Sequence, residues 1–504
     1  LVYRAVLLFL ISENHTTKSK IKIHRLHRHL NSKHFNDRFC SRPRWKTQVI
    51  CLTLIFLGVG VLFVTRAWLG ILLLRSSKQP ANFESTPVQD AKIATWLRRA
   101  RMYAESTKEN QNADRNTSVS AEYSGLLRDD GTQIIVCYYT LSGDLNTLWE
   151  LNPSHIESHL CTHIIVGFAN VVNCSLDLGN SPSIYKEVVN LKNREPKLKV
   201  MISAGGSNEL HSGFSEMVKN HANRKQIFAS LLNRFIRSVL NITKTYGFDG
   251  LDVDWEFPAW LGADEREKIH FAQLLEELRR EFDRSGQNLI LSVAVAAPQA
   301  IVDQSYEVPD IARYVDFVNL MAYDYHFYVW YFPVTGLNAP LFARAAETGY
   351  LSTLNVNFSA QYWLSKGMPR EKLIVGIPTY GHSYKLDNPL NHALLAPANG
   401  FGNLGRMGFV DYPSICQFLD AGAKRVFDED AKVPFTYKDY EWISYDDTKS
   451  IKYKADWIRA NGFGGAMIFS LNIDDWNNTC NFNESFPLTR IVTLAYDQRT
   501  VQYV

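Results

Sequence analysis

Residues 249–256 read Asp-Gly-Leu-Asp-Val-Asp-Trp-Glu. In a β-strand, successive side chains point to opposite faces of the sheet. One face of this strand would therefore be apolar, and the other would carry carboxyl groups. The apolar series is Leu251, Val253 and Trp255, and the acidic series is Asp252, Asp254 and Glu256.

The three carboxyl groups lie roughly 6.6 Å apart along the strand, which is twice the rise per residue. Repulsion at this spacing raises the pKa of at least one group, and a carboxyl with a raised pKa keeps its proton near neutral pH. A solvated acidic edge or a calcium site would have polar or small residues on the opposite face. The apolar face instead indicates a covering of helices, so we expect the carboxyl groups to point into an enclosed space.

From Gln133 onward, short β-branched runs alternate with longer amphipathic stretches such as 224–246 and 265–284. The runs expected to form strands are 134–139, 163–168, 198–203, 250–256, 289–295, 317–323, 373–378 and 465–471. Near-continuous apolar runs are typical of buried parallel strands. The alternation predicts an α/β fold, a (β/α)8 TIM barrel. Active sites of such barrels lie at the C-terminal ends of strands, and Glu256 ends the fourth run.

The interval between the seventh and eighth runs, residues 382–445, is too long for an ordinary loop. Its aromatic residues include Tyr384, Phe435, Tyr437 and Trp442. We therefore expect a small folded insertion within a barrel that spans residues 132–494, with residues 495–504 as a tail.

The N-terminal part of the chain has a different composition. Residues 1–48 are polar and basic, apart from a short apolar run, and we expect them to be cytoplasmic and disordered. Residues 49–74 are predominantly apolar, with Arg66 as the one charge, and long enough to cross about 30 Å of hydrocarbon, which predicts a transmembrane signal anchor. The basic residues before it predict a single-pass type II membrane protein with a lumenal or extracellular barrel. A cleaved signal peptide followed by secretion is the alternative. Residues 75–131 lack apolar periodicity and would form a stalk.

The bulk composition agrees with a globular protein. Of 504 residues, 46% are hydrophobic and 21% are charged, and the net charge of +3 predicts no nucleic-acid partner. The seven cysteines favour an oxidising compartment, and six Asn-X-Ser/Thr triplets follow the apolar segment. We expect a monomer.

The stretch 249–256 resembles the DxxDxDxE signature of glycoside hydrolase family 18, the chitinases and their relatives. Four further stretches resemble motifs of the same family, in the expected order: 199–206, 317–326, 376–381 and 463–467. The resemblance covers residues 133–494. It implies an α+β insertion between strands seven and eight that forms one wall of the substrate cleft.

The resemblance also implies a reaction. The substrate would be chitin or another β-1,4-linked N-acetylglucosamine chain, cleaved with retention and without an enzyme nucleophile. Glu256 would protonate the leaving glycosidic oxygen and then activate water. Asp254 would orient the acetamido group, and Asp252 would share a proton with Asp254 and help to set the pKa of Glu256. Neither a metal nor an organic cofactor is implied, and no metal-ligand spacing appears.

The family motifs assign binding residues and disulfides as well. Tyr323 and Asp324 would bind the sugar at the cleavage subsite, and Met321 and Tyr380 would line it, unless these last two belong to the barrel core. The remaining residues expected to bind substrate are Phe168, Trp255 and Phe469. The family's bridges correspond to Cys137–Cys161 and Cys416–Cys480.

The chain departs from active chitinases at two aromatic positions. Ser207 and Phe469 stand where the family usually has Trp, and the aromatic stretch 327–332 lengthens the sixth loop, either rebuilding the cleft or forming a protein or membrane contact. These departures leave two alternatives to a chitinase. One is a non-catalytic chitinase-like lectin or signalling protein, and the other is an endo-N-acetylglucosaminidase that trims glycans.

Overall fold

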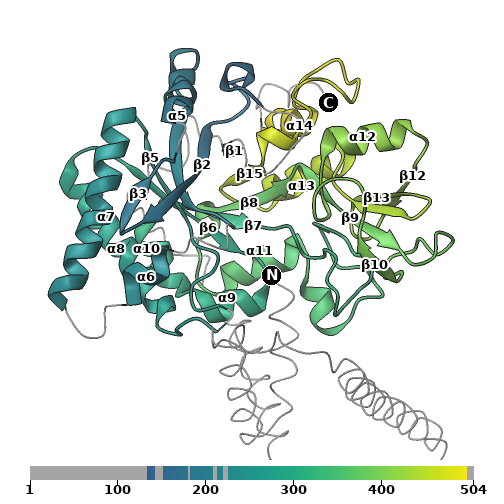
Figure 1. The fold of residues 1–504 in the computed structure, drawn as a ribbon, viewed down its shortest axis with the longest axis horizontal. Helices are drawn as coiled ribbons and strands as arrows, with labels where there is room; N and C mark the ends of the chain where they lie inside the picture. Colours follow the sequence, from purple (N-terminus) through teal and green to yellow (C-terminus); the bar gives the residue numbers. More distant parts are fainter. Residues whose placement is uncertain are drawn as a thin grey trace, which may run out of the picture. The chain divides into compact units, whose positions relative to one another are not determined.

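The structure is a computed structural model that describes residues 133–141, 151–179, 182–207, 213–219, 225–260 and 262–496. Its centre is a barrel of eight parallel strands in the order β1-β15-β8-β7-β6-β5-β4-β2, closed by the pairing of β1 with β2 (Figure 1). The strands are β1 Ile134–Thr140, β2 His163–Val172, β4 Lys199–Gly205, β5 Gly250–Asp254, β6 Ile290–Ala296, β7 Phe317–Met321, β8 Leu373–Pro378 and β15 Gly465–Phe469. The predicted (β/α)8 barrel is therefore confirmed.

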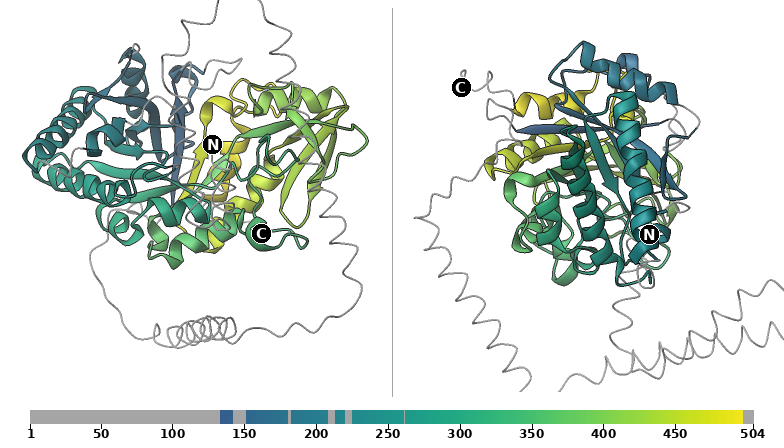
Figure 2. Two further views of the ribbon diagram at one scale, coloured as in Figure 1. Left: turned by 60° about the horizontal axis from the view of Figure 1, so that its bottom comes forward. Right: turned by 90° about the vertical axis from the view of Figure 1, so that its left-hand side faces the viewer.

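Helices follow the strands and cover the outside of the barrel (Figures 1 and 2). They are α5 Pro182–Val189, α6 Gly213–Lys219, α7 Lys225–Tyr246, α8 Glu267–Ser285, α9 Gln299–Ser305, α10 Val308–Tyr314, α11 Val356–Ser365, α13 Thr448–Ala460 and α14 Pro487–Tyr496. Helix α8 shows why they form: Phe271, Leu275 and Phe282 are buried at helical spacing, and the helix ends at Gly286 in the left-handed conformation. Single turns of 3-10 helix occur at η1 Pro153–His155, η2 Asn190–Asn193, η4 Gly349–Thr353, η5 Arg370–Lys372 and η6 Leu471–Ile473.

Strand β2 is longer than the sequence predicts. It continues past the barrel and forms an antiparallel hairpin with β3, Ser175–Asp177. Asn173 and Cys174 make the turn with φ of 51° and 56°. Ala169 still pairs with β4, and residues 170–172 pair with β3 in the hairpin, beyond the barrel proper.

A second sheet lies between β8 and α13, where the sequence predicts an insertion. Its order is β10-β9-β14-β13-β12, with β11 also paired to β9, and every pairing is antiparallel. The elements are β9 Tyr380–Leu386, β10 Ala398–Phe401, β11 Phe409–Asp411, α12 Tyr412–Asp420, β12 Lys424–Asp428, β13 Val433–Lys438 and β14 Glu441–Ser444. Figure 1 and the left view of Figure 2 place this insertion on the side of the barrel away from α7.

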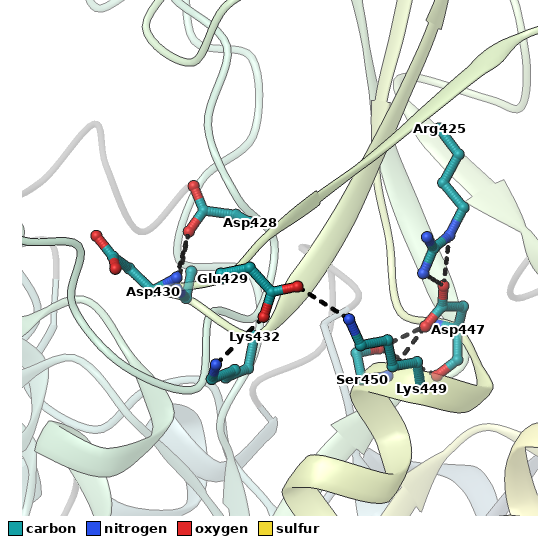
Figure 3. A network of polar contacts seen from close by, with 9 residues as sticks. Arg425, Asp428, Glu429, Asp430, Lys432, Asp447, Lys449 and Ser450 are labelled. Carbon is teal, nitrogen blue, oxygen red and sulfur yellow. Dashed lines mark hydrogen bonds and ion pairs between the residues drawn. The ribbon is translucent and has the colours of Figure 1, made fainter.

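Polar contacts tie the insertion to barrel helix α13 (Figure 3). Arg425 of β12 donates to Asp447, whose side chain also caps the first turn of α13. Glu429, after β12, accepts from Lys449 of α13 at 3.0 Å. The exposed pair Glu429–Lys449 adds little stability, whereas Asp447, which pairs with Arg425, is buried.

The predicted disulfides Cys137–Cys161 and Cys416–Cys480 are confirmed. No helix within the described part of the chain is long and apolar enough to cross a membrane. The predicted anchor at 49–74 lies outside the described residues, as do the segments 1–48 and 75–131 on either side of it.

Candidate active site

The carboxyl group of Asp252 lies in the middle of the barrel and accepts hydrogen bonds from four strands. Tyr138 Oη and Ser203 Oγ donate to Oδ2 at 2.8 and 2.7 Å, and Ser292 Oγ and Asn319 Nδ2 donate to Oδ1 at 2.6 and 3.2 Å. Burial raises the pKa of Asp252, and these four donors oppose the rise because they stabilise the carboxylate. These four hydrogen bonds thus hold the Asp252 carboxyl group in one orientation.

Asp254 and Glu256 continue the acidic face toward the barrel mouth. Burial, followed by the charges of Glu256 and Asp252, holds the pKa of Asp254 well above its usual range. Its Oδ1 atom is buried and has no hydrogen-bond partner among the described residues. Glu256 follows the end of β5 and is exposed to solvent. Crowding by surrounding protein and then the negative charge of Asp324 raise the pKa of Glu256 to about 7. Glu256 therefore combines a retained proton with access from outside.

Two glycines after β4 allow β5 and its acids to lie where they do. A Cβ on Gly205, whose φ is +114°, would lie 1.9 Å from the carbonyl oxygen of Asp254. Gly206 donates its N–H to the same oxygen at 2.9 Å, and a Cβ on it would lie 2.8 Å from the ring of Phe168. The absence of a side chain at these two positions thus lets the backbone of Asp254 and the ring of Phe168 lie this close to the end of β4.

Asp324 follows β7 in the left-handed conformation, with φ of 58°. Its Oδ1 accepts from Tyr380 Oη at 2.5 Å and lies 2.7 Å from His382 Nε2, and both of these residues belong to β9. Its N–H donates to Asn338 Oδ1 at 2.9 Å. The insertion therefore holds the acid that the sixth-strand motif singled out. His382 and Asn338 were not predicted as site residues.

Aromatic rings line the space around these acids. The ring of Phe469 lies 5.7 Å from that of Tyr138, 5.8 Å from that of Tyr323 and 6.3 Å from that of Tyr380. Phe168 lies 6.2 Å from Tyr138. Half-buried Met321 packs against the same cluster. Flat apolar faces beside a few polar groups are typical of a ligand-binding cleft.

Two further aromatic residues were not predicted as part of the site. Phe409 of β11 stacks on Tyr380 with ring centroids 4.2 Å apart, because β11 pairs with β9. The ring of Phe327 lies 5.6 Å from that of His382, so the aromatic stretch 327–332 begins beside the site. Trp330, at the middle of this stretch, is 73% exposed.

The expectation that Trp255 binds substrate is not supported. The residue is 2% exposed, and its ring stacks on that of Phe214 at 5.4 Å, with the ring of Phe271 at 5.8 Å. These partners belong to helices α6 and α8. The indole therefore lies on the outer face of β5, as strand alternation requires, and away from the acids.

Within the ranges that the structure describes, no group of three His, Cys, Asp or Glu side chains could hold a metal ion. The chemistry that this arrangement of side chains can supply is proton transfer by Glu256, supported by the buried carboxyl groups of Asp252 and Asp254.

Comparisons with known proteins agree with this geometry. Residues 134–474 match the model of the family described as "Glycosyl hydrolases family 18". Chitotriosidase-1 of Mus musculus is 36% identical over 368 residues, which are 71% of this chain and 76% of the relative. An immunomodulatory active chitinase from Trichuris suis has a solved structure with a TM-score of 0.67 and 31% identity, covering 72% of this chain and 99% of that one. Human YKL-39, described as a pseudo-chitinase with retained chitooligosaccharide binding, has a solved structure with a TM-score of 0.66 and 35% identity. The match covers 72% of this chain and 99% of that one. The chain therefore belongs to glycosyl hydrolase family 18, the chitinases and chitinase-like proteins.

Proposed function

We propose that this protein hydrolyses β-1,4-linked N-acetylglucosamine chains, chitin or its oligomers, by a retaining, substrate-assisted mechanism. The observation that carries the proposal is the state of Glu256. This carboxyl is exposed at the barrel mouth, and its pKa is raised to about 7. An acid whose pKa lies near the working pH can both donate and recover a proton, as general acid–base catalysis requires.

In the first step the substrate's own N-acetyl oxygen attacks the anomeric carbon, and the bond to the glycosidic oxygen breaks. Glu256 gives its proton to that leaving oxygen. In the second step the Glu256 carboxylate takes a proton from water, and the water oxygen attacks the anomeric carbon from the face that the leaving group vacated. The cyclic oxazolinium intermediate then reopens, so the configuration is retained without an enzyme nucleophile.

Asp254 supports the intermediate in this proposal. Positive charge develops on the acetamido group as its oxygen forms the new bond, and a preorganised hydrogen-bond acceptor in a dry site stabilises the acetamido N–H as this happens. The buried Oδ1 of Asp254, unpartnered within the described residues, is available to accept the acetamido N–H. Asp252 contributes through its charge, which is one of the causes that raise the pKa of Asp254.

The test is a product profile of the purified full-length chain on chito-oligosaccharides of graded length. The wild type should release shorter oligosaccharides, and Glu256→Gln should lower turnover by about 10²-fold or more while calorimetry still shows binding. Glu265→Gln is the matched control, since Glu265 is an exposed carboxyl in the same β5–α8 connection. Absence of product from the wild type at every pH between 4 and 8 would contradict the proposal.

A non-catalytic carbohydrate-binding protein is the second candidate. Ser207 is exposed and offers no ring for stacking, and Phe469 presents a smaller face than Trp. The relative YKL-39 is described as a pseudo-chitinase that keeps oligosaccharide binding. Binding without product in the same experiment would favour this candidate, and release of glycans from a glycoprotein would favour an endo-N-acetylglucosaminidase.

A further inference from the structure

The backbone of Ala259, three residues after Glu256, is held by side chains from two helices. Ala259 is 0% exposed and adopts the left-handed conformation, with φ of 57°. Its N–H donates to Glu267 Oε2 at 3.0 Å, and its carbonyl oxygen accepts from Gln304 Nε2 at 2.7 Å. Glu267 begins helix α8, and Gln304 lies in α9. Both polar backbone groups of Ala259 therefore bond to side chains from outside the loop.

These two hydrogen bonds compensate for an unfavourable backbone. The left-handed conformation is unfavourable for a residue with a Cβ, and so is a buried N–H or C=O that lacks a partner. Glu267 is itself 2% exposed, and glutamate is rarely buried unless it is paired. The N–H of Ala259 provides such a partner. The conformation of this loop thus depends on Glu267 and Gln304 as well as on its own sequence.

Helix α8 also contacts the residue that precedes Glu256. The ring of Trp255 lies 5.8 Å from that of Phe271, which belongs to α8. Glu267 and Phe271 are four residues apart, so they lie on the same face of the helix. One face of α8 therefore contacts the chain before Glu256 through Phe271 and the loop after Glu256 through Glu267.

Glu256 thus lies on a short segment that is held at both ends. Three residues separate Trp255 from Ala259, and Glu256 is the first of them. The ring of Pro258 restricts one more backbone dihedral angle in this segment. Because the side chain of Glu256 is exposed at the barrel mouth, the position of its carboxyl group depends on the backbone that carries it.

Resting on the proposed function, we infer that Glu267 and Gln304 are positioning residues: by bonding Ala259 on both sides, they hold the loop that directs the Glu256 carboxyl group toward the glycosidic oxygen. Neither residue is one of the three acids of the proposed chemistry. Their contribution is to the rate of proton transfer, because misplacing a reacting group by about 1 Å can cost about 10²-fold. Binding of the sugar is largely independent of them.

The experiment measures kcat and KM on a chito-oligosaccharide for the full-length wild type and three variants. Glu267→Leu removes the acceptor for the N–H of Ala259, so kcat should fall by about 10- to 100-fold while KM stays within about twofold. Gln304→Leu removes the donor to the carbonyl oxygen and should change kcat in the same direction. Glu267→Gln keeps an acceptor oxygen at the same position, so its kcat should lie within about threefold of the wild type.

Thr162→Val is the matched control. Thr162 Oγ1 accepts the N–H of Ile135 at 2.8 Å and donates to its carbonyl oxygen at 3.0 Å. These are side-chain contacts with both backbone groups of one residue, as at Ala259, but near the N-terminal end of β1. That end of a barrel contributes to stability and not to the site. In urea unfolding Thr162→Val should lose stability and keep its kcat, whereas Glu267→Leu should lose both.

Unchanged kcat in Glu267→Leu and Gln304→Leu would overturn the inference. An equal loss of kcat in Thr162→Val would also overturn it, because it would show an effect of stability alone. If Glu267→Leu does not fold, the kcat of Gln304→Leu decides between the two results.

If the wild type has no turnover, the proposed function fails, and the titration of Glu256 tests the positioning by itself. A Glu256 carboxyl group that leaves its place loses part of the burial and of the Asp324 charge that raise its pKa. Carbon-13 NMR of labelled glutamate carboxyl groups, assigned with Glu256→Gln, should then show a lower titration midpoint in Gln304→Leu than in Thr162→Val. Equal midpoints in these two variants would overturn the inference.

Discussion

Replacing Gly205 with alanine would put a methyl group where the backbone of β5 already lies. The added Cβ would be 1.9 Å from the carbonyl oxygen of Asp254 and 2.8 Å from its carbonyl carbon. Carbon and oxygen atoms in contact are normally about 3.3–3.6 Å apart. Backbone must therefore move by more than an ångström, and the residue that moves is the one proposed to hold the acetamido group.

The expected loss of stability has two parts. A side chain at φ of +114° costs about 1–3 kcal/mol, and overpacking against backbone costs about another 1–3 kcal/mol. Gly286→Ala separates the two, because Gly286 has φ of +67° and nothing within 4 Å of its added Cβ. This control carries the conformational part alone, about 1–2 kcal/mol for a side chain in the left-handed region. The free energy of unfolding of Gly205→Ala should thus be lower than that of Gly286→Ala by about 2 kcal/mol or more.

Urea unfolding of the full-length variants, with the slope m checked for constancy, measures both values. Turnover on chito-oligosaccharides provides the second readout, and it should fall in Gly205→Ala and persist in Gly286→Ala. If Gly205→Ala were as stable as Gly286→Ala and kept full turnover, the close approach of β4 to Asp254 would not be what places the site.

Two further predictions concern buried charges. Lys454→Met should lower the free energy of unfolding by about 3–5 kcal/mol. Lys454 and Asp446 are each 1% exposed and pair at 2.6 Å, so the variant leaves a buried carboxylate without its cationic partner. Adding Asp446→Asn should recover part of the loss in urea unfolding, and no recovery would contradict the pairing. Burial raises the pKa of Asp474 to about 6, so the folded state holds this proton more tightly than the unfolded state, and stability from this group is complete below about pH 3.8 and lost as pH rises through 6. The stability of the wild type relative to Asp474→Asn should therefore fall by up to about 3 kcal/mol between pH 4 and 7, and a constant difference would refute it.

The barrel strands could be predicted because each is buried on both faces and therefore reads as an apolar run. The run 373–378 coincides with β8, and the others agree with the structure except near their ends. The main difference is β2, which was expected to stop at Phe168 and continues to Val172. Its extension depends on antiparallel pairing with β3, and a pairing partner is not visible in the apolar pattern of one strand.

The sequence predicts the site residues whose positions follow from alternation along one strand. It does not predict contacts between side chains of different strands. Alternation along β5 assigned the faces of Asp252 and Trp255 from local sequence alone. In contrast, Tyr138 meets Asp252 across 114 positions of the chain, and His382 meets Asp324 across 58. No local spacing indicates such contacts. The family motifs identified Asp324 and Tyr380, but His382 becomes part of the site only because β9 leaves the barrel beside the loop after β7.

The departures from active chitinases affect aromatic positions and leave the three acids Asp252, Asp254 and Glu256 in place. Phe469 still packs among Tyr138, Tyr323 and Tyr380, so a smaller aromatic ring occupies the position where the family usually has Trp. The four donors to Asp252 come from strands that Ser207 and Phe469 do not belong to. Binding of sugar requires no acid with a pKa near 7, whereas protonation of a glycosidic oxygen does. We therefore expect the substitutions to weaken the hold on long polymers, and we expect the arrangement of Asp252, Asp254 and Glu256 to support turnover of oligosaccharides that the remaining cleft can bind.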